Sequence, residues 1–259
     1  MRRVLCVLSG LAVVLSVAPP APAAPPAGAD AGADARPAVV ERRVIGHSVQ
    51  GRPIVAWRLG EPGARRVVLV SSMHGNEDAT AQILDRLRDG RRYVRGIDLW
   101  VVPSYNPDGI ARGTRRNAHG VDLNRNYPYR WVRLDGNYES GPRPGSEPET
   151  RAMMAFLTEI APHRVISFHQ PLNGVDTDTK DPGFARRLAR RLHLPTTRLM
   201  CGGLCHGTMT MWFNRHFEGS ALTVEYGARP GRHRLRVQAP RQVLDVLGAR
   251  RSKRPPPGR

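Results

Sequence analysis

The chain has 259 residues, with 40 Lys and Arg against 22 Asp and Glu, and a formal net charge of +18 at pH 7. This length suffices for one α/β domain of ordinary size, and the charge favours anionic partners through long-range attraction. The sequence carries no interleaved aromatic and basic stripe, no zinc-finger spacing and no recognition-helix pattern, which excludes a dedicated nucleic-acid-binding module. A solvated, arginine-rich surface without a specific ligand is the alternative to an anionic partner.

The N-terminal residues have the pattern of a secretory signal peptide. Arg2 and Arg3 precede an apolar run over residues 4–17, and residues 21–23 (Ala-Pro-Ala) offer a small-x-small cleavage site. The apolar run is shorter than the roughly 20 residues that a membrane span needs. We therefore expect residues 1–23 to be removed and the mature protein to be secreted without a membrane span; an uncleaved anchor is the alternative. Outside the cell, an anionic cell-wall polymer would suit the basic surface.

Composition divides the rest of the chain into three segments. Residues 24–37 are mostly Ala, Pro, Gly and Asp and predict a linker, whereas the basic, proline-rich residues 250–259 predict a disordered tail. Between them, residues 38–249 alternate strand and helix patterns without internal repeats, which favours a single α/β domain. Strands are expected at 39–49, 53–59, 66–71, 97–103, 164–168 and 221–225, and helices at 77–88, 148–160, 182–192, 209–217 and 240–248.

A long polar segment interrupts this alternation. Residues 106–145 are rich in Gly, Pro and Asn and show no sustained period. A stretch of this length without regular structure is usually functional or disordered, so we expect it to contact the substrate.

Two strand ends carry residue types that bind a divalent metal. His74 and Glu77 follow the strand at 66–71 across a Gly-containing turn, at the edge where open α/β sheets place their ligand sites. His169 directly follows the buried strand at 164–168 and would supply a third ligand. Imidazole and carboxylate groups suit Zn²⁺, whose catalytic sites keep a fourth position open for water. We expect one zinc ion per chain; a hydrogen-bonded structural histidine is the alternative for His169.

Two cysteines remain after removal of the signal peptide. Cys201 and Cys205 are close in sequence, and an oxidising compartment selects against free thiols, so we expect a disulfide between them. Two free thiols, or metal ligation together with His206, are the alternatives.

Four short motifs follow one another along the chain. The first three lie between Glu77 and His169, and the fourth lies beyond His169. They are Asn-Pro-Asp-Gly at 106–109, Arg-Arg-Asn at 115–117, Gly-Val-Asp-Leu-Asn-Arg-Asn at 120–126 and Thr-Val-Glu-Tyr at 223–226. In number and order they resemble the M14 family of zinc carboxypeptidases over residues 40–230, and the run at 120–126 is a highly specific signature of that family. The resemblance implies a single-domain, three-layer α/β/α fold with a mixed, mostly parallel central sheet.

The resemblance also implies a role for each matching residue of the metal site. His74, Glu77 and His169 match the family's zinc ligands. Glu225, at the end of a late strand, matches the catalytic glutamate. A carboxylate in that position takes a proton from the attacking water and later delivers it to the leaving amine.

Polar residues of the long segment match positions that bind the substrate. Asn124 and Arg125 match the pair that grips the free carboxylate of the terminal residue, for which a guanidinium offers two parallel hydrogen bonds. Arg115 matches the arginine that polarises the scissile carbonyl and stabilises the charge of the tetrahedral state. Arg116 is the alternative, because the register there rests on a single Arg-x-Asn match. Ordinary surface charge is the second alternative for both Arg115 and Arg116.

One position departs from the digestive members of the family. Counted back from Glu225, the position of their mobile tyrosine falls on Gly203, and no tyrosine stands near it in the sequence. His206 could act as a donor in its place, although a solvent-facing loop histidine is the simpler interpretation. The same register places Thr210 and Thr223 toward the side-chain pocket, where small hydroxyls fit a polar terminal residue.

Compact exported relatives of this kind look like the murein peptide amidases and γ-D-glutamyl-diaminopimelate peptidases. We therefore expect a monomeric metallocarboxypeptidase that hydrolyses a peptide or γ-glutamyl bond beside a residue with a free carboxylate, in cell-wall stem peptides. A general L-amino-acid carboxypeptidase acting on scavenged peptides is the first alternative. A wall-binding protein that retains zinc without turnover is the second. An acyl-amino-acid deacylase is the third, and the complete carboxylate-binding motif argues against it.

Overall fold

The computed structural model describes residues 38–199 and 201–254. The expected signal peptide (1–23), the expected linker (24–37) and the end of the basic tail (255–259) lie outside the described residues. Within the described part of the chain, no helix combines the length and the apolar character that crossing a bilayer requires.

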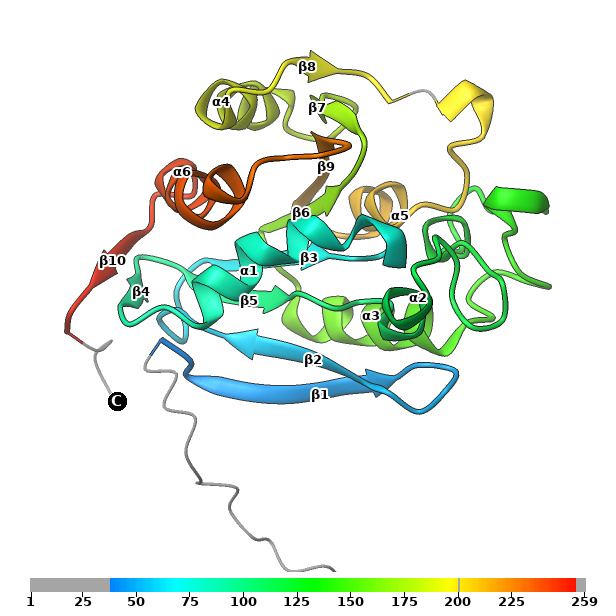
Figure 1. The fold of residues 1–259 in the computed structure, drawn as a ribbon, viewed down its shortest axis with the longest axis horizontal. Coiled ribbons are helices and arrows are strands. Elements are labelled where there is room, and N and C mark those ends of the chain that lie inside the picture. The colour runs from blue at the N-terminus through cyan, green and yellow to red at the C-terminus, as the bar shows by residue number, and fades with distance from the viewer. Residues whose placement is uncertain (1–37, 200, 255–259) are drawn as a thin grey trace, which may run out of the picture. The chain divides into compact units, whose positions relative to one another are not determined.

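An eight-stranded mixed sheet forms the centre of the domain (Figure 1). Its spatial order is β1 (Glu41–His47), β2 (Pro53–Arg58), β5 (Asp98–Val102), β3 (Arg66–Ser71), β6 (Arg164–His169), β9 (Ser220–Gly227), β7 (Leu172–Asp176) and β8 (Thr196–Thr197). The neighbours β5, β3, β6 and β9 are parallel, whereas β2 and β7 join this group in antiparallel pairs. The carboxyl ends of the central strands therefore meet at one edge of the sheet.

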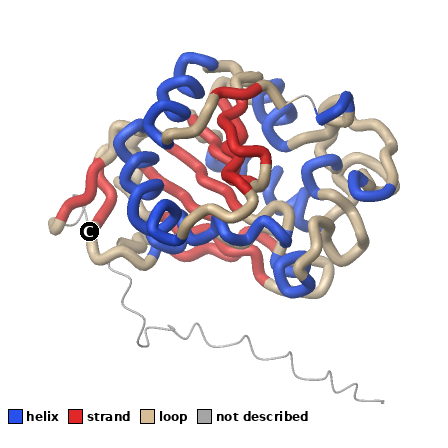
Figure 2. Tube along the Cα trace, turned by 45° about the horizontal axis from the view of Figure 1, so that its top comes forward, coloured by secondary structure: helices blue, strands red, loops and turns tan. Residues whose placement is uncertain are grey.

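Helices cover both faces of this sheet (Figure 2). One face carries α1 (Ala81–Arg88), α4 (Pro182–Leu192) and α6 (Ala239–Val246), and the other carries α3 (Pro148–Ile160) and α5 (Met209–His216). The shorter elements are α2 (Pro107–Arg112), the 3-10 helices η1 (Gly75–Thr80), η2 (Leu123–Arg125), η3 (Gly136–Tyr138) and η4 (Cys201–Gly203), and the π-helical turn η5 (Arg234–Gln238).

The side-chain alternation along β3 explains why the core has two sides. Val67 and Leu69 pack in the hydrophobic cluster beneath α1, α4 and α6, whereas Val68 and Val70 pack in the cluster beneath α3 and α5. Successive side chains of a strand point to opposite faces, so a strand that is apolar on both faces needs helices on both sides. The arrangement confirms the expected three-layer α/β/α fold with a mixed, mostly parallel sheet.

A second, two-stranded sheet corrects the expected boundary of the C-terminal tail. β10 (Arg250–Ser252) pairs antiparallel with β4 (Tyr93–Arg95), so the tail does not begin at residue 250. The composition of residues 250–252 is basic and predicts disorder, but their backbone groups form hydrogen bonds with a distant strand. Such pairing leaves no local signal in the sequence.

The long segment at 106–145 remains irregular, as expected, apart from short helices. α2 forms because the side chain of Asn106 accepts a hydrogen bond from Gly109 N at 2.9 Å and Pro107 occupies the first turn. It ends at Gly113, which adopts the left-handed conformation with φ of 63°. Figure 2 shows that loops and short helices gather at the end of the sheet where the central strands terminate.

Candidate active site

Three buried side chains meet where β3 and β6 end. His74 and Glu77 belong to the turn that leads from β3 into η1, and His169 is the last residue of β6. Because these strands are parallel neighbours, their ends lie side by side. His74 Nδ1 lies 2.7 Å from Glu77 Oε1, and His169 Nδ1 lies 2.9 Å from Glu77 Oε2. One ligand atom of each residue lies within 4.8 Å of the others, so the structure assembles the expected metal triad.

The second nitrogen of each imidazole has a partner of its own. His169 Nε2 lies 2.8 Å from Ser167 Oγ, and His74 Nε2 lies 3.2 Å from Asp122 Oδ1. An ionised carboxylate only accepts hydrogen bonds, so it keeps the His74 proton on Nε2 and leaves the Nδ1 lone pair facing the triad. The two Nδ1 atoms lie 3.3 Å apart. Converging nitrogen and carboxylate lone pairs fit a divalent cation, and this nitrogen and oxygen set suits zinc.

The carboxylates of the site are held in their ionised form. Burial opposes ionisation of Glu77, but the imidazoles of His74 and His169 outweigh burial and hold its pKa well below the usual range. The pKa of Asp122 is also lowered, because His74 and Arg115 outweigh the effect of burial. Burial opposes the charged form of His74 too, yet the two carboxylates raise its pKa. The negative charge that these groups concentrate attracts a cation.

Glu225 lies beside the triad on the neighbouring strand. β9 pairs with β6 in a register that places Glu225 opposite His169. The side chain of Glu225 accepts a hydrogen bond from Leu172 N at 3.3 Å, and the residue is only 6% exposed. Burial raises the pKa of its carboxyl group above the ordinary value. A carboxyl group in such a position can both accept and return a proton.

The two candidate carbonyl-polarising arginines occupy different places. The Arg115 guanidinium lies in the site, where Nε and Nη2 donate to Asp122 Oδ2 at 3.0 and 2.8 Å and Nη1 lies 3.4 Å from Glu77 Oε1. Arg116 Nη1 instead donates to the Gly136 carbonyl at 2.8 Å. Arg116 is absent from the described residues that line the cavity around the metal triad, so its expected role in substrate binding finds no support in the geometry.

The two residues expected to bind the terminal carboxylate sit in η2. The side-chain oxygen of Asn124 accepts a hydrogen bond from Met209 N at 3.1 Å, which ties η2 to the start of α5. Arg125 Nη1 donates to the Asn124 carbonyl at 2.8 Å, but its buried Nε has no hydrogen-bond partner among the described residues. Burial lowers the pKa of Arg125, and the nearby Arg115 adds to this effect. A carboxylate bound to Arg125 would accept a hydrogen bond from Nε and would stabilise the charged form of the guanidinium.

A cavity of about 300 Å³ joins these groups. It is lined by the metal triad, Glu225, Arg115, Asn124 and Arg125, and the expected pocket residues Thr210 and Thr223 also line it. Segments that are far apart in the sequence therefore converge on one concave space. The combination of a metal triad, a proton-transferring carboxylate and two arginines can hydrolyse an amide bond and bind an adjacent carboxylate.

Comparison with known proteins identifies the family. The sequence profile of the zinc carboxypeptidase family, Peptidase_M14, matches residues 28–171, which include the whole metal triad and the Asn124–Arg125 pair. The chain belongs to the M14 family of zinc carboxypeptidases. His74, Glu77 and His169 correspond to the His-x-x-Glu…His zinc site of these metallopeptidases. Glu225 lies beyond the matched residues.

Two relatives of this chain are murein peptide amidases. This zinc carboxypeptidase is 33% identical over 165 residues to murein peptide amidase A of Escherichia coli K12, which covers 58% of this chain and 67% of that protein. It is also 33% identical over 166 residues to murein peptide amidase A of Vibrio campbellii, covering 58% and 65% of the two chains.

Solved structures give the same result for the fold. The crystal structure of murein-tripeptide amidase from Escherichia coli O157 matches with a TM-score of 0.65 and 26% identity, covering 80% of this chain and 91% of that one. Carboxypeptidase A of Helicoverpa armigera matches with a TM-score of 0.63 and 17% identity, covering 82% and 68%, which supports the fold alone.

The cysteine pair of this zinc carboxypeptidase borders its cavity. Cys201 and Cys205 form a disulfide, and both line the cavity. Because both sulfurs are bonded to each other, neither is a metal ligand, and His206 is absent from the described metal-binding groups. The disulfide closes the loop that contains Gly203, onto which the sequence register counted back from Glu225 places the tyrosine of the digestive enzymes.

Four residues that sequence reasoning assigned no role take part in the site. Asp122 orients His74 and Arg115, and its place inside the signature at 120–126 was a signal that could have revealed it. Tyr138 lines the cavity, with the Arg115 and Arg125 guanidiniums 5.3 and 5.0 Å from its ring centre.

Two acidic residues, Asp176 and Asp178, also line the cavity. Asp176 is the last residue of β7 and Asp178 lies two residues beyond it; the sequence pattern did not predict this strand, so no signal in the sequence pointed to them. Asp176 Oδ1 accepts hydrogen bonds from Asp178 N at 3.0 Å and from Leu199 N at 3.2 Å. Burial raises the pKa of Asp176. The pocket therefore contains acidic side chains, although the expected pocket residues are both threonines.

Proposed function

We propose that this zinc carboxypeptidase hydrolyses the γ-glutamyl bond that precedes diaminopimelate in cell-wall stem peptides. The observation that carries the proposal is that one cavity contains groups for the reaction, groups for a terminal carboxylate and two further acids. The relatives named murein peptide amidase support the choice of a cell-wall peptide. The basic surface, with a net charge of +18, suits an anionic wall environment.

The terminal carboxylate binds at Arg125 and Asn124. Arg125 has a buried Nε without a hydrogen-bond partner among the described residues, and a carboxylate can accept from it and from a second guanidinium nitrogen in parallel. The Asn124 amide nitrogen adds a third donor beside it. This site requires that the residue released by hydrolysis carries a free carboxylate.

The side chain of the released residue faces Asp176 and Asp178. Diaminopimelate bears an ammonium group at the far end of its side chain, and a partly buried carboxylate is the partner that such a group needs. Asp176 uses one oxygen for two backbone hydrogen bonds and keeps the other without a hydrogen bond among the described residues. Thr210 and Thr223, which carry hydroxyl groups, line the same cavity.

The metal triad, Glu225 and Arg115 line the same cavity as these pocket residues. Zinc, when bound by His74, Glu77 and His169, supplies Lewis acidity toward water and the carbonyl oxygen. Glu225 takes the proton of the attacking water and returns it to the amine of diaminopimelate when the bond breaks. Arg115 donates hydrogen bonds to the carbonyl oxygen as negative charge develops there.

The decisive experiment compares two sets of substrates with the zinc-loaded protein. One is L-Ala-γ-D-Glu-meso-diaminopimelate, and the other consists of N-blocked dipeptides ending in Phe, Lys or Glu. Release of diaminopimelate with a kcat/KM at least tenfold above that for every dipeptide is the expected result. Release of ordinary L-residues alone would establish a general carboxypeptidase, and turnover of neither set would overturn the proposed reaction.

Two variants separate chemistry from specificity. Glu225→Gln should bind zinc with unchanged stoichiometry while losing about 10²–10⁴ of kcat, because the amide cannot accept a proton. Asp176→Asn should keep the metal and the reaction but lose the preference for diaminopimelate over a terminal residue without an ammonium group. Equal losses on both substrates in Asp176→Asn would refute the pocket assignment and leave the catalytic groups untouched.

We infer that the protein acts outside the cytoplasm. Residues 2–23 contain the charged, apolar and small-residue regions of a cleavable export signal. Expression of the full chain with a C-terminal tag, followed by N-terminal sequencing of the secreted fraction, should give a mature chain that begins at Ala24. Quantitative retention of the uncleaved chain in the cell would contradict this inference.

A further inference from the structure

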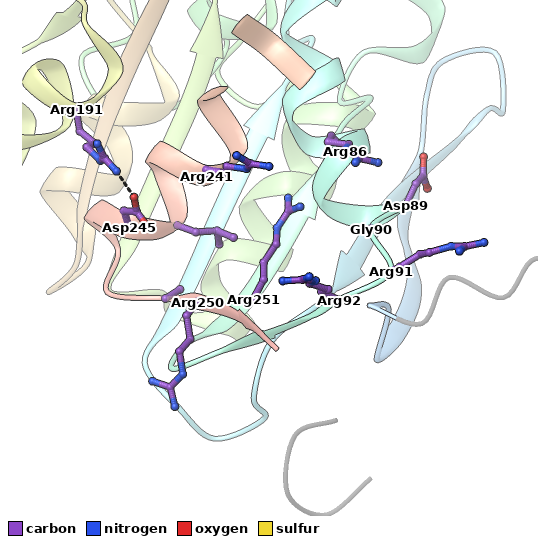
Figure 3. Close-up of a pocket in the computed structure, with 12 residues that line it drawn as sticks. Arg86, Asp89, Gly90, Arg91, Arg92, Arg191, Arg241, Asp245, Arg250 and Arg251 are labelled. Carbon is purple, nitrogen blue, oxygen red and sulfur yellow. Dashed lines mark hydrogen bonds and ion pairs between the residues drawn. The ribbon is translucent and has the colours of Figure 1, made fainter. Parts of the chain in front are cut away.

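A cluster of arginines lines a second cavity, remote from the catalytic one (Figure 3). Its volume is about 710 Å³. Among the described residues, its charged lining consists of Arg86, Arg91, Arg92, Arg191, Arg241, Arg250 and Arg251, together with Asp89 and Asp245. We call this cavity the arginine pocket.

The arginine pocket lies at the opposite edge of the sheet from the metal triad. α1 follows β3 and η1 and runs back along the sheet, so its last turn, with Arg86, lies near the beginning of β3 (Figure 1). β10 contributes Arg251 and α6 contributes Arg241. None of these residues belongs to the catalytic cavity, so a ligand here would not block it.

The acids at the rim are already paired. Asp245 forms an ion pair with Arg191, and Asp89 forms one with Arg88 at 2.7 Å. The other arginines of the pocket form no ion pair within the part of the chain that the structure describes. Several guanidiniums therefore share one concave surface without countercharge.

Arg251 is the most constrained member of this group. Its Nη2 is buried and has no hydrogen-bond acceptor among the described residues. Burial lowers the pKa of Arg251, and the charges of Arg86, Arg241 and Arg92 lower it further. Figure 3 shows the Arg251 side chain extended between Arg241 and Arg92, toward Arg86, whereas Arg250 and Arg91 point away. A buried donor surrounded by like charges is stabilised by an anion that accepts from it.

We propose that the arginine pocket binds the phosphate groups of an anionic phosphodiester polymer that lacks bases. Guanidinium groups match phosphate oxygens with paired hydrogen bonds, and the pocket contains no lysine among its described lining residues. Its volume of about 710 Å³ exceeds what one phosphate fills, which favours consecutive groups of a chain. No aromatic side chain lines it among the described residues, so bases would find no surface for stacking.

This polymer site would hold the enzyme at an anionic surface while the catalytic cavity stays free. The proposal does not depend on which peptide the catalytic site cleaves. It predicts that loss of the pocket changes binding to the polymer and leaves hydrolysis of a small peptide unchanged.

The test measures binding of the full-length protein to poly(glycerol phosphate) by calorimetry at about 0.1 M salt. Arg86→Gln/Arg241→Gln removes two converging charges, and both side chains are exposed on helices. Arg112→Gln/Arg215→Gln removes the same charge from exposed positions on α2 and α5 and is the matched control. We expect binding at least tenfold weaker in the first variant and within about twofold of wild type in the control.

Comparison with a single-stranded DNA of equal phosphate number decides the class of polymer. DNA should bind at least tenfold more weakly than poly(glycerol phosphate) to the wild-type protein. DNA binding of equal strength that depends on Arg86 and Arg241 would overturn the proposed ligand in favour of nucleic acid. Equal weakening in the pocket variant and the control would show general surface attraction and overturn the site itself.

Thermal unfolding provides a second measurement that does not depend on activity. Tripolyphosphate should raise the Tm of the wild-type protein and of the control, but not that of Arg86→Gln/Arg241→Gln. Without a ligand, the pocket variant should unfold at the same or a higher temperature, because repulsion among the guanidiniums is reduced. Arg92→Gln, in the loop between α1 and β4, serves for the same measurement if the double variant fails to fold.

Discussion

Asp122 Oδ1 lies 3.2 Å from Nε2 of His74, so a zinc ligand is oriented by a residue of the irregular segment 106–145. The other oxygen of Asp122 accepts two hydrogen bonds from Arg115, at 3.0 and 2.8 Å. Asp122 is fully buried, at 0% exposure. One carboxylate therefore couples the orientation of the metal ligand His74 to the position of the Arg115 guanidinium.

Asp122→Asn should weaken zinc binding about 10–100-fold, because the amide no longer holds the imidazole proton of His74 by charge. Zinc affinity is measured by competition with a chromophoric chelator at constant pH. Asp135→Asn, an exposed acid in the same irregular segment, is the control and should bind zinc as the wild type does. Unchanged affinity in Asp122→Asn would show that the imidazole is oriented by other contacts.

Arg125→Lys should lower kcat/KM about 10–100-fold, mostly through a higher KM. A lysine ammonium cannot form two parallel hydrogen bonds with the terminal carboxylate, and a hydrogen bond between charged groups contributes about 1.5–3 kcal/mol. Arg116→Lys is the matched control, since Arg116 donates to the Gly136 carbonyl outside the cavity. In steady-state kinetics on one peptide, the kcat/KM of Arg116→Lys should stay within about twofold of wild type. A large loss in Arg116→Lys with none in Arg125→Lys would mean that Arg116, and not Arg125, binds the terminal carboxylate.

Gly75→Ala should destabilise the protein and weaken zinc binding together. A Cβ on Gly75 would lie 1.9 Å from the carbonyl carbon of Gly109 and 2.3 Å from Ile110 N, both backbone atoms of α2. Either α2 or the turn that carries His74 has to move. Gly231→Ala, where a Cβ meets open space, should leave both the Tm and the zinc affinity unchanged. A normal zinc affinity in Gly75→Ala would mean that α2 moves instead of the metal site.

Asp108 makes the stability of the fold depend on pH. Burial opposes its ionisation, but hydrogen bonds from Gln50 N, Ser48 and Arg52 outweigh burial and lower its pKa. The folded pKa lies below the unfolded value of about 3.9, so this contribution is complete above that pH and is lost as the pH falls through the folded pKa. Asp108→Asn should reduce the free energy of unfolding by about 1–3 kcal/mol at pH 6–7.

The difference between Asp108→Asn and wild type should shrink below about pH 4, because the Asp108 carboxylate of the unfolded chain takes up a proton there before that of the folded chain does. Denaturant unfolding of both proteins between pH 3 and pH 7 provides the measurement. If the difference in the free energy of unfolding stays constant over this range, the substitution destabilises the fold through altered packing and not through the lost charge.

Much of the catalytic site could be predicted from the sequence because its residues stand beside local patterns. The apolar strands at 66–71 and 164–168 lie in the observed β3 and β6, and the carboxyl ends of adjacent parallel strands meet at one edge. This geometry alone brings His74, Glu77 and His169 together. The Cys201–Cys205 disulfide was also predictable, because its two residues are separated by only four positions.

The strand β7 and the residues that follow it could not be predicted in the same way. β7 and β8 are short, so neither carries a long alternating pattern. They pair in parallel, and the helix α4 separates them along the chain. Asp176 and Asp178 therefore reach the cavity without any local signal. Tyr138 lines the same cavity from a short 3-10 helix inside a segment that has no period at all.

The sequence by itself determined the central strands, the helices that cover them, the family and the residues that stand at the ends of β3 and β6, because each of these depends on side chains that are neighbours along one element. Tertiary structure alone decided that Arg115 and not Arg116 enters the cavity, and that arginines from several separate elements share one pocket. The physical reason is that a periodic pattern reports which face of an element is buried. It does not report which distant element packs against that face.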